Sequence, residues 1–281
     1  MTAGPAGGRP TVVVVRGTGD VGSAVAHVLH GAGFAVAIHD VERPAAPRRG
    51  MAFTDAVFDG ACTLAGLRAR RVDDPDGVAA ALAARAEVPV STADLDALLD
   101  AVRPDVLVDA RMRKRARPEV QRDLAPLTIG LGPNFVAGET TDLAIETIWG
   151  DELGAVVAAG PTRGLAGEPR SFDGHARDRF VYAPAAGLLR TAAAIGQRVR
   201  AGDPVAAIGD LELRAPLDGI LRGLTHDGVE VDAGAKVVEV DPRGEAGAVF
   251  GIGARPRRIA LGVLAGIRSR GSRGEPPSSG G

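Results

Sequence analysis

The chain contains few of the residues that mark several common classes of protein. Its 281 residues include one cysteine, Cys62, which excludes a disulfide framework and a thiolate zinc site. Aromatic residues make up 3%, and Lys114 and Lys236 are the only lysines, so arginine carries nearly all the positive charge. The first apolar run, Val12–Val15, is far too short to cross a bilayer, and the small and polar residues before it lead us to expect no secretory leader. We therefore expect a cytoplasmic protein that makes no membrane contact.

Other absences bear directly on function. No segment has the spacing of a nucleophile motif or of a metal-ligand set, so no catalytic residue is named and no metal site is expected. A net charge of −2 gives no general attraction to nucleic acid. The length suits two modest domains, each with its own core. These features favour a protein that binds a small ligand or a partner over an enzyme, although they do not decide between them.

The most informative segment lies near the N-terminus. The apolar run Val12–Val15 leads into Gly17-Thr18-Gly19-Asp20-Val21-Gly22, then into a helix-like stretch, and a second apolar run ends at Asp40. This order of strand, glycine turn, helix, strand and acid is typical of a Rossmann unit. It predicts free N–H groups that face a diphosphate, and an Asp40 that accepts a ribose hydroxyl. Asp20 opposes this interpretation because a carboxylate repels phosphate, so a turn that only packs a helix remains an alternative.

Residues 11–160 alternate strand-like and helix-like segments. This pattern predicts an α/β fold, a Rossmann-like, doubly wound and mostly parallel sheet with helices on both faces. A strand-turn-strand unit is expected over 61–72 and a terminal hairpin over 143–159. Helices are expected over 76–86, 93–102 and 119–124. Residues 1–10 and 269–281 are expected to be disordered, and residues 161–180 to form a linker or an extended loop.

The segment 181–268 contains an internal repeat. Residues 183–190 match 215–222, and the Ala-Gly turn at 201–202 recurs at 233–234 with the same offset. Two such copies predict a small all-β barrel-sandwich hybrid domain with interlocked halves, closed by a helix over 257–267. The pattern resembles biotinyl and lipoyl carrier domains, which need a lysine at the hairpin between the halves. Here Gly209-Asp210-Leu211-Glu212-Leu213 contains no lysine, so we expect neither biotin nor lipoate, and the sandwich serves structure or docking.

Ligands of doubly wound sheets bind at the carboxyl ends of the strands. The stretch Asp109-Ala110-Arg111-Met112-Arg113-Lys114 follows an apolar run and suits a small anionic ligand, although a solvated basic loop explains it equally well. The turn Gly130-Leu131-Gly132-Pro133-Asn134 either directs N–H groups toward an anion or simply turns the chain. Arg48-Arg49 forms either an anion clamp over the glycine turn or an exposed loop. The expected cofactor-binding residues are Gly17, Thr18, Gly19, Asp20, Gly22, Asp40, Asp109, Arg111, Lys114, Gly130, Gly132 and Asn134.

The order of these segments resembles the selenium-dependent molybdenum hydroxylase system protein family, accessory proteins of molybdenum hydroxylases such as xanthine dehydrogenase. The matching stretches are Arg16–Asp20, Pro104–Arg111, Gly130–Pro133, Ile145–Thr147, Gly219–Leu224 and Val240–Gly244. The resemblance implies a role in maturing or supplying such a hydroxylase, with the client enzyme or a co-maturation protein as partner. It also implies a nucleotide-like or molybdopterin-like ligand on the Rossmann-like domain. The chain departs from the family at Asn134, at Asp151, and at Ala254-Arg255-Pro256, where an Asp-Lys-Ala-like stretch is expected.

Three functions fit these observations. The first is an accessory factor for a molybdenum hydroxylase, and this is the one we expect. The second is an NAD(P)-dependent oxidoreductase, favoured by the glycine turn and Asp40 but short of a proton donor, since His39 alone lies at a strand end. The third is a non-catalytic nucleotide sensor or scaffold. The ligand stays open between NAD(P), another nucleotide and molybdopterin.

Overall fold

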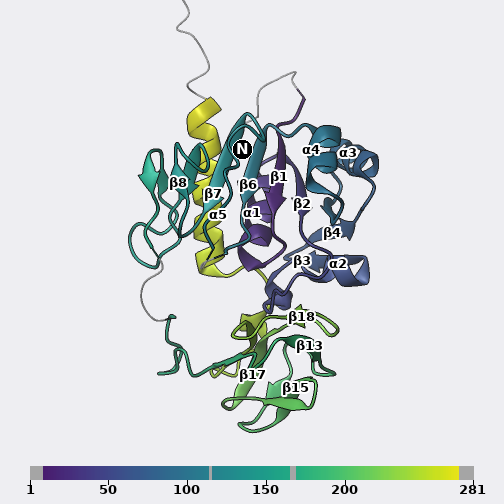
Figure 1. Ribbon diagram of the computed structural model, residues 1–281, viewed down its shortest axis with the longest axis vertical. Coiled ribbons are helices and arrows are strands. Elements are labelled where there is room, and N and C mark those ends of the chain that lie inside the picture. Colours follow the sequence, from purple (N-terminus) through teal and green to yellow (C-terminus); the bar gives the residue numbers. More distant parts are fainter. Residues whose placement is uncertain (1–8, 114–115, 165–168, 272–281) are drawn as a thin grey trace, which may run out of the picture.

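The structure is a computed structural model that describes residues 9–113, 116–164 and 169–271 (Figure 1). Its first domain is built on a nine-stranded sheet with the order β10-β9-β7-β6-β1-β2-β5-β4-β3. The seven inner strands are parallel to their neighbours, and only the two edge strands run antiparallel. The strands are β1 (Val12–Arg16), β2 (Ala35–His39), β3 (Ala61–Leu64), β4 (Leu67–Arg71), β5 (Val88–Ser91), β6 (Val106–Asp109), β7 (Leu127–Leu131), β9 (Leu143–Ile145) and β10 (Val156–Val157). The expected α/β class with a mostly parallel sheet is confirmed.

Helices cover both faces of this sheet. Along β1, Val13 and Val15 face the core formed with α1 (Asp20–Gly31), while Val14 faces the core formed with α3 (Pro75–Ala84) and α4 (Leu95–Val102). This is the alternation of a strand buried on both sides. Asp74 and Asp94 cap α3 and α4 by accepting backbone N–H groups.

The chain leaves β1 in one direction to β2 and later continues through β6 to β7 in the other direction. The switch point of the doubly wound sheet therefore lies between β1 and β6, where Arg16 is aligned with Asp109. A crevice at the carboxyl ends of these two strands is where such folds bind ligands.

Several local expectations can be compared with the structure. The strand-turn-strand unit is confirmed as the β3–β4 hairpin, and β9 and β10 form the expected antiparallel pair. The helix expected over 119–124 is wrong, because this segment consists of turns and irregular chain. A short pair, β8 (Val136–Ala137) with β11 (Gly160–Pro161), extends into the stretch expected to be a linker.

The second domain consists of two four-stranded antiparallel sheets. They have the orders β12-β19-β17-β14 and β16-β15-β13-β18. The strands are β12 (Phe180–Tyr182), β13 (Gly187–Arg190), β14 (Arg198–Val199), β15 (Pro204–Ile208), β16 (Leu211–Arg214), β17 (Gly219–Leu224), β18 (Glu230–Val231) and β19 (Lys236–Asp241). Each sheet takes strands from both copies of the repeat, and exchanging the copies maps one strand order onto the other. The interlocked quasi-twofold arrangement follows from the repeat in the sequence.

The last helix, α5 (Ala254–Gly271), was expected to close the second domain, but it packs in the first. Ile259, Val263 and Ile267 belong to the core that α1 shares with the sheet, and Figure 1 shows α5 beside α1. The sandwich domain is thus inserted between β11 and α5. The outer parts of the two expected tails, residues 1–8 and 272–281, lie outside the described residues.

The segment that follows β2 attaches the two domains to each other. It comprises a loop, the 3₁₀ turn η1 (Arg49–Met51) and α2 (Asp55–Asp59). Pro47 O accepts the N–H of Leu224 at 2.7 Å, and Arg49 Nε donates to the carbonyl of Leu224 at 2.8 Å. Arg43 also donates to the carbonyl of Gly228 at 2.6 Å. Within the described part of the chain, no helix combines the length and apolar character needed to cross a membrane.

Candidate functional site

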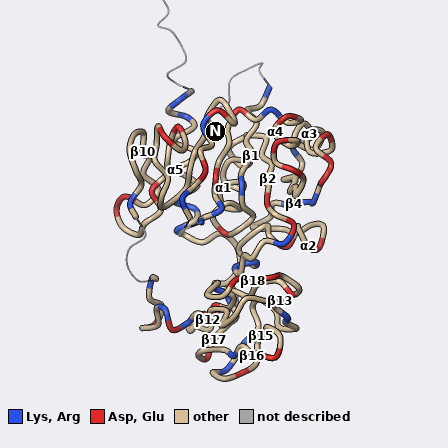
Figure 2. The backbone as a smooth tube through the Cα atoms, viewed as in Figure 1, with Lys and Arg blue, Asp and Glu red and all other residues tan. Residues whose placement is uncertain are grey.

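A cleft of about 1290 Å³ lies between the two domains. The first domain contributes the carboxyl ends of β1, β2 and β6 together with the start of α5, and the second contributes β12 and β19. Figure 2 shows Lys and Arg on both sides of the junction between the domains. The cleft therefore includes the switch-point crevice and extends from it to the sandwich.

The three glycines of the first turn are there for different reasons. Gly17 has φ +109° and a Cβ there would lie 3.1 Å from the Ala110 backbone. A Cβ on Gly22 would lie 2.0 Å from the carbonyl oxygen of Gly17, so the fold requires both glycines. A Cβ on Gly19 would meet no described atom within 4 Å, and Gly19 lines the cleft. Packing does not explain this glycine, whereas a ligand that approaches the N-terminus of α1 does.

Asp40 lines the cleft, but its carboxylate holds the glycine turn in place. Its Oδ2 accepts both the backbone N–H and the hydroxyl of Thr18 at 2.6 Å, and its Oδ1 accepts the N–H of Val41 at 2.8 Å. The expected ribose contact must share these oxygens. His39 lies outside the cleft, with Nε2 2.9 Å from the carbonyl oxygen of Ala93, and burial lowers the pKa of its imidazole.

Asp20 does not block the crevice. Its carboxylate is 2.9 Å from Arg48, whose guanidinium also binds Glu239 of the second domain at 2.8 Å. Burial alone would raise the pKa of Asp20, but the ion pair with Arg48 outweighs it and holds that pKa below its ordinary value. The repulsion that Asp20 would exert on an anionic ligand is thereby offset. Arg48 therefore bridges the two domains. The sequence had suggested either an anion clamp or an exposed loop for the Arg48-Arg49 pair, and neither describes this role.

The basic stretch after β6 is partly neutralised by its own neighbours. Arg111 donates to the buried carboxylate of Asp109 and is also paired with Glu119, and Gln121 donates to Asp109 at 2.7 Å. Arg111 and Arg113 line the cleft, whereas Asp109 does not. Lys114 lies outside the described residues.

The turn that follows β7 lies beside the cleft. Pro133 lines it, but Gly130, Gly132 and Asn134 do not. A Cβ on Gly130 would lie 2.1 Å from the Phe135 ring, and Gly132 has φ +91°, so both glycines have a local structural reason. Asn134 donates to the carbonyl of Ala116 at 3.2 Å. Thr18 and Gly22 likewise support the first turn without lining the cleft.

The wall that the second domain contributes was missed by the sequence patterns. Its centre is Glu239, a fully buried carboxylate that pairs with the four cations of what we call the Glu239 cluster. These cations are Arg48, Arg179, Arg222 and Lys236. Asp20 and Asp241 also pair with Arg48 and Arg222, but the four cations still outnumber these three carboxylates. Arg48 was noted in the sequence as half of a basic pair. The members of the cluster in the second domain were not, since the repeat indicates strands and turns but not which side chains face the other domain.

Lys236 gives this wall a group that titrates near neutral pH. Burial and the neighbouring Arg48 lower the pKa of Lys236 to about 8, against the opposing effect of Glu239. In the unfolded chain the pKa of Lys236 has its ordinary value of 10.5. The unfolded chain therefore binds more protons than the folded chain between about pH 8 and 10.5. Burial of the protonated Lys236 therefore lowers the free energy of unfolding below about pH 8. This loss of stability diminishes as the pH rises from about 8 to 10.5.

We expect an NMR titration of isotopically labelled lysine to give a midpoint of about 8 for Lys236. The chain has two lysines, so Lys236→Arg assigns the signals and Lys114 is the internal reference. An anion bound in the cleft should move the midpoint upward, because it stabilises the protonated amine. A Lys236 midpoint above 10 would contradict the burial described here.

Arg255 and a set of aromatic residues complete the cleft. Arg255 donates twice to the carbonyl of Thr147, at 2.7 and 3.1 Å, and makes no ion pair within the described residues. The chain has seven phenylalanines, one tryptophan and one tyrosine, and five of these line the cleft. They are Trp149, Phe172, Phe180, Tyr182 and Phe250. Trp149 and Tyr182 are partly exposed, whereas guanidinium groups lie over the rings of Trp149, Phe172 and Phe180. Cations and partly exposed aromatic rings in one cleft suit an anion that carries a ring system.

Comparison with known proteins supports homology to one curated protein. The chain is 40% identical over 253 residues to Escherichia coli K12 YqeB, an "uncharacterized protein", in an alignment that covers 90% of this chain and 46% of YqeB. The chain thus spans about half the length of that relative, and the two are homologous over the shared span. No family model matches the chain.

Two solved structures illustrate the local likeness that the comparison found. One is a succinylglutamate desuccinylase/aspartoacylase from Rhodobacter sphaeroides, 23% identical, with a TM-score of 0.22 over 52% of this chain and 60% of that one. The other is the ectoine utilization protein EutE (DoeB) from Ruegeria pomeroyi, 12% identical, with a TM-score of 0.26 over 83% and 85%. At TM-scores this low the folds do not superpose as wholes, so no property of these two proteins is carried over.

Proposed function

We propose that this chain binds a small anionic ligand with a ring system, a nucleotide or a molybdopterin-type compound, in the cleft between its domains. The observation that carries the proposal is Gly19. It sits at the N-terminus of α1, opens onto the cleft, and has no packing reason to be glycine. The helix start offers N–H groups and a positive dipole end, and Arg48 balances the charge of Asp20 beside it.

The rest of the cleft suits the other parts of such a ligand. Arg255 and Arg113 offer guanidinium groups to further anionic oxygens, and Trp149 and Tyr182 present partly exposed rings on opposite domains. Within this proposal the chain acts as an accessory factor that holds the ligand for a molybdenum hydroxylase, and the sandwich domain docks on that client or a co-maturation protein. The sandwich contains no carrier lysine at its hairpin, which favours docking over a covalent carrier role.

The experiment is a binding panel followed by one substitution. Thermal shift and calorimetry with NAD, NADP, ATP, CTP and molybdopterin should identify a compound that stabilises the folded chain. In Gly19→Val, the affinity for that compound should fall at least tenfold while the melting temperature without ligand falls only slightly, because φ at Gly19 is −61° and suits any residue, although valine is a poorer N-cap than glycine. Gly31→Val, at an open position of the same helix outside the cleft, is the control.

Four results would count against the proposal or one of its parts. A panel in which no compound moves the melting temperature removes the binding claim. Normal affinity in Gly19→Val would reduce the first turn to an architectural element. Oxidation of NADH or NADPH with a carbonyl substrate would favour the oxidoreductase instead. Binding by Arg255→Gln with its full salt dependence would remove Arg255 from the site.

A further inference from the structure

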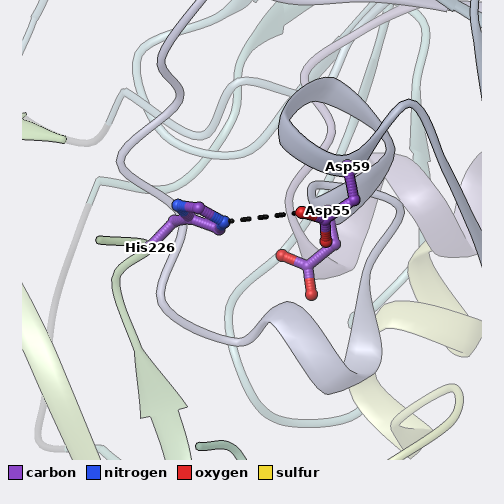
Figure 3. Close-up of side chains that lie close together, drawn as sticks. All are labelled: Asp55, Asp59 and His226. Carbon is purple, nitrogen blue, oxygen red and sulfur yellow. Dashed lines mark ion pairs between the residues drawn. The ribbon is translucent and has the colours of Figure 1, made fainter. Parts of the chain in front are cut away.

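A second group of side chains lies at the domain junction, outside the cleft. The single turn of α2 presents Asp55, Phe58 and Asp59 on one face, because they are spaced i, i+3 and i+4. His226, from the loop between β17 and β18, lies opposite this face (Figure 3). The ligand atoms of Asp55, Asp59 and His226 lie within 4.8 Å of one another.

The position and tautomer of His226 are fixed by its neighbours. Its ring stacks on Phe58 with the centroids 3.9 Å apart and an interplanar angle of 9°. Its Nδ1 is 2.8 Å from the carbonyl oxygen of Asp227, which can only accept, so Nδ1 carries the proton in the neutral ring. The lone pair on Nε2 then points at Asp59 Oδ1, 3.9 Å away, which is too long for a hydrogen bond. A lone pair held against two carboxylates is the arrangement of a metal ligand whose second nitrogen is oriented by a carbonyl.

We propose that Asp55, Asp59 and His226 bind a divalent transition-metal ion such as Zn²⁺, which links α2 to the second domain. One imidazole nitrogen and two carboxylate oxygens form a donor set that Zn²⁺ accepts, at bond lengths of about 2.0–2.2 Å, with water completing the coordination. Mg²⁺ and Ca²⁺ prefer more oxygen ligands and avoid imidazole. The site does not depend on the function proposed for the cleft, since none of its residues lines that cleft.

The charges around the site determine how strongly it holds a cation. Arg49 donates to Asp55 Oδ1 at 2.8 Å, which orients the carboxylate and leaves Oδ2 for the metal, while its positive charge weakens binding. Cys62 lies close by, and burial, with the charges of Asp55 and Asp59, raises the pKa of its thiol to about 11. Asp55 and Asp59 add negative charge to this junction, which Arg49 partly offsets.

The site would fasten the domains together. Asp55 and Asp59 belong to the first domain and His226 to the second, so the ion would hold the segment that follows β2 against the sandwich. This segment includes Arg48, the bridge to Glu239 in the cleft wall. The sequence gives no sign of the site because its ligands come from distant parts of the chain.

The test is a Zn²⁺ titration of the whole chain without an affinity tag, in competition with a chromophoric chelator. We expect one equivalent to bind and to raise the melting temperature. In Asp59→Asn and in His226→Gln, the affinity should fall at least tenfold and the thermal shift should disappear. His175→Gln is the matched control, because His175 is paired with Asp178 at 2.5 Å elsewhere on the second domain. Mg²⁺ alone should give no shift.

Failure to bind one equivalent overturns the proposal, as does unchanged affinity in both variants or an equal loss in His175→Gln. Should either variant fail to fold, X-ray absorption on the wild-type chain with one equivalent of Zn²⁺ decides. One imidazole with oxygen ligands supports the site, whereas sulfur or several imidazoles overturns it. If a nucleotide raises the melting temperature but Zn²⁺ does not bind, the metal site is wrong and the proposal for the cleft still stands.

Discussion

Replacing Glu239 with glutamine is expected to lower the free energy of unfolding by about 3–5 kcal/mol. The carboxylate is fully buried and lies between Arg48, Arg179, Arg222 and Lys236, so its loss leaves four closely spaced cations without their central anion. The cost comes from the uncompensated buried charges and their mutual repulsion. Urea unfolding at pH 7 measures the difference.

The matched control is Glu212→Gln. Glu212 pairs with Arg214, and both side chains are about half exposed, so its loss should cost less than about 1 kcal/mol. Equal costs for the two variants would mean that the Glu239 cluster contributes no more than a surface ion pair. Arg48 would also lose one of its two partners in Glu239→Gln and would keep only Asp20.

The pH dependence of this contribution has a definite sign. Burial would raise the pKa of Glu239, but Arg48 and Lys236 outweigh it and hold that pKa well below its ordinary value. The stabilisation is therefore complete above the unfolded-state pKa of about 4.3 and is lost as the pH falls toward the lower folded-state value. The difference between wild type and Glu239→Gln should shrink on acidification below about pH 4.

Gly22→Ala is expected to destabilise the first domain by about 3 kcal/mol or more. The new Cβ would lie 2.0 Å from the carbonyl oxygen of Gly17, a backbone atom that cannot move without opening the turn between β1 and α1. Alanine otherwise favours helix by up to about 1 kcal/mol, so the clash must exceed this gain. Thermal or denaturant unfolding measures the result.

Gly31→Ala makes the same change in the same helix at a position where no described atom lies within 4 Å. It should leave stability unchanged or raise it by up to about 1 kcal/mol. Gly22→Ala should thus lower the free energy of unfolding, whereas Gly31→Ala in the same helix should leave it unchanged or raise it. If neither substitution lowered stability, the helix could not lie as close to the turn at Gly22 as described here.

Local patterns in the sequence predicted those elements whose causes are local. The glycine turn between two apolar runs indicated β1, α1 and β2, and the repeat indicated the two interlocked sheets of the second domain. The segment 119–124 failed because its conformation is set by distant polar contacts. Gln121, buried, bonds Arg16 and Asp109, and its N–H donates to Thr140. No helical pattern predicts such contacts.

The candidate site was predictable on one wall only. Gly17, Gly19, Asp20, Asp40 and Arg111 were chosen from strand ends, and all five line the cleft. The opposite wall depends on how the two domains pack, which no periodicity encodes. Lys236 and Tyr182 on that wall belong to strands of the sandwich, where the sequence shows only a repeat.

The placement of α5 has a consequence for the order of events during synthesis. Ile259, Val263 and Ile267 complete the core beneath α1, yet they follow the whole sandwich in the chain. A ribosome therefore finishes the second domain before the first has received its final hydrophobic residues. The sandwich can close early, whereas the parallel sheet must wait, partly uncovered, for a helix made some hundred residues after most of its strands.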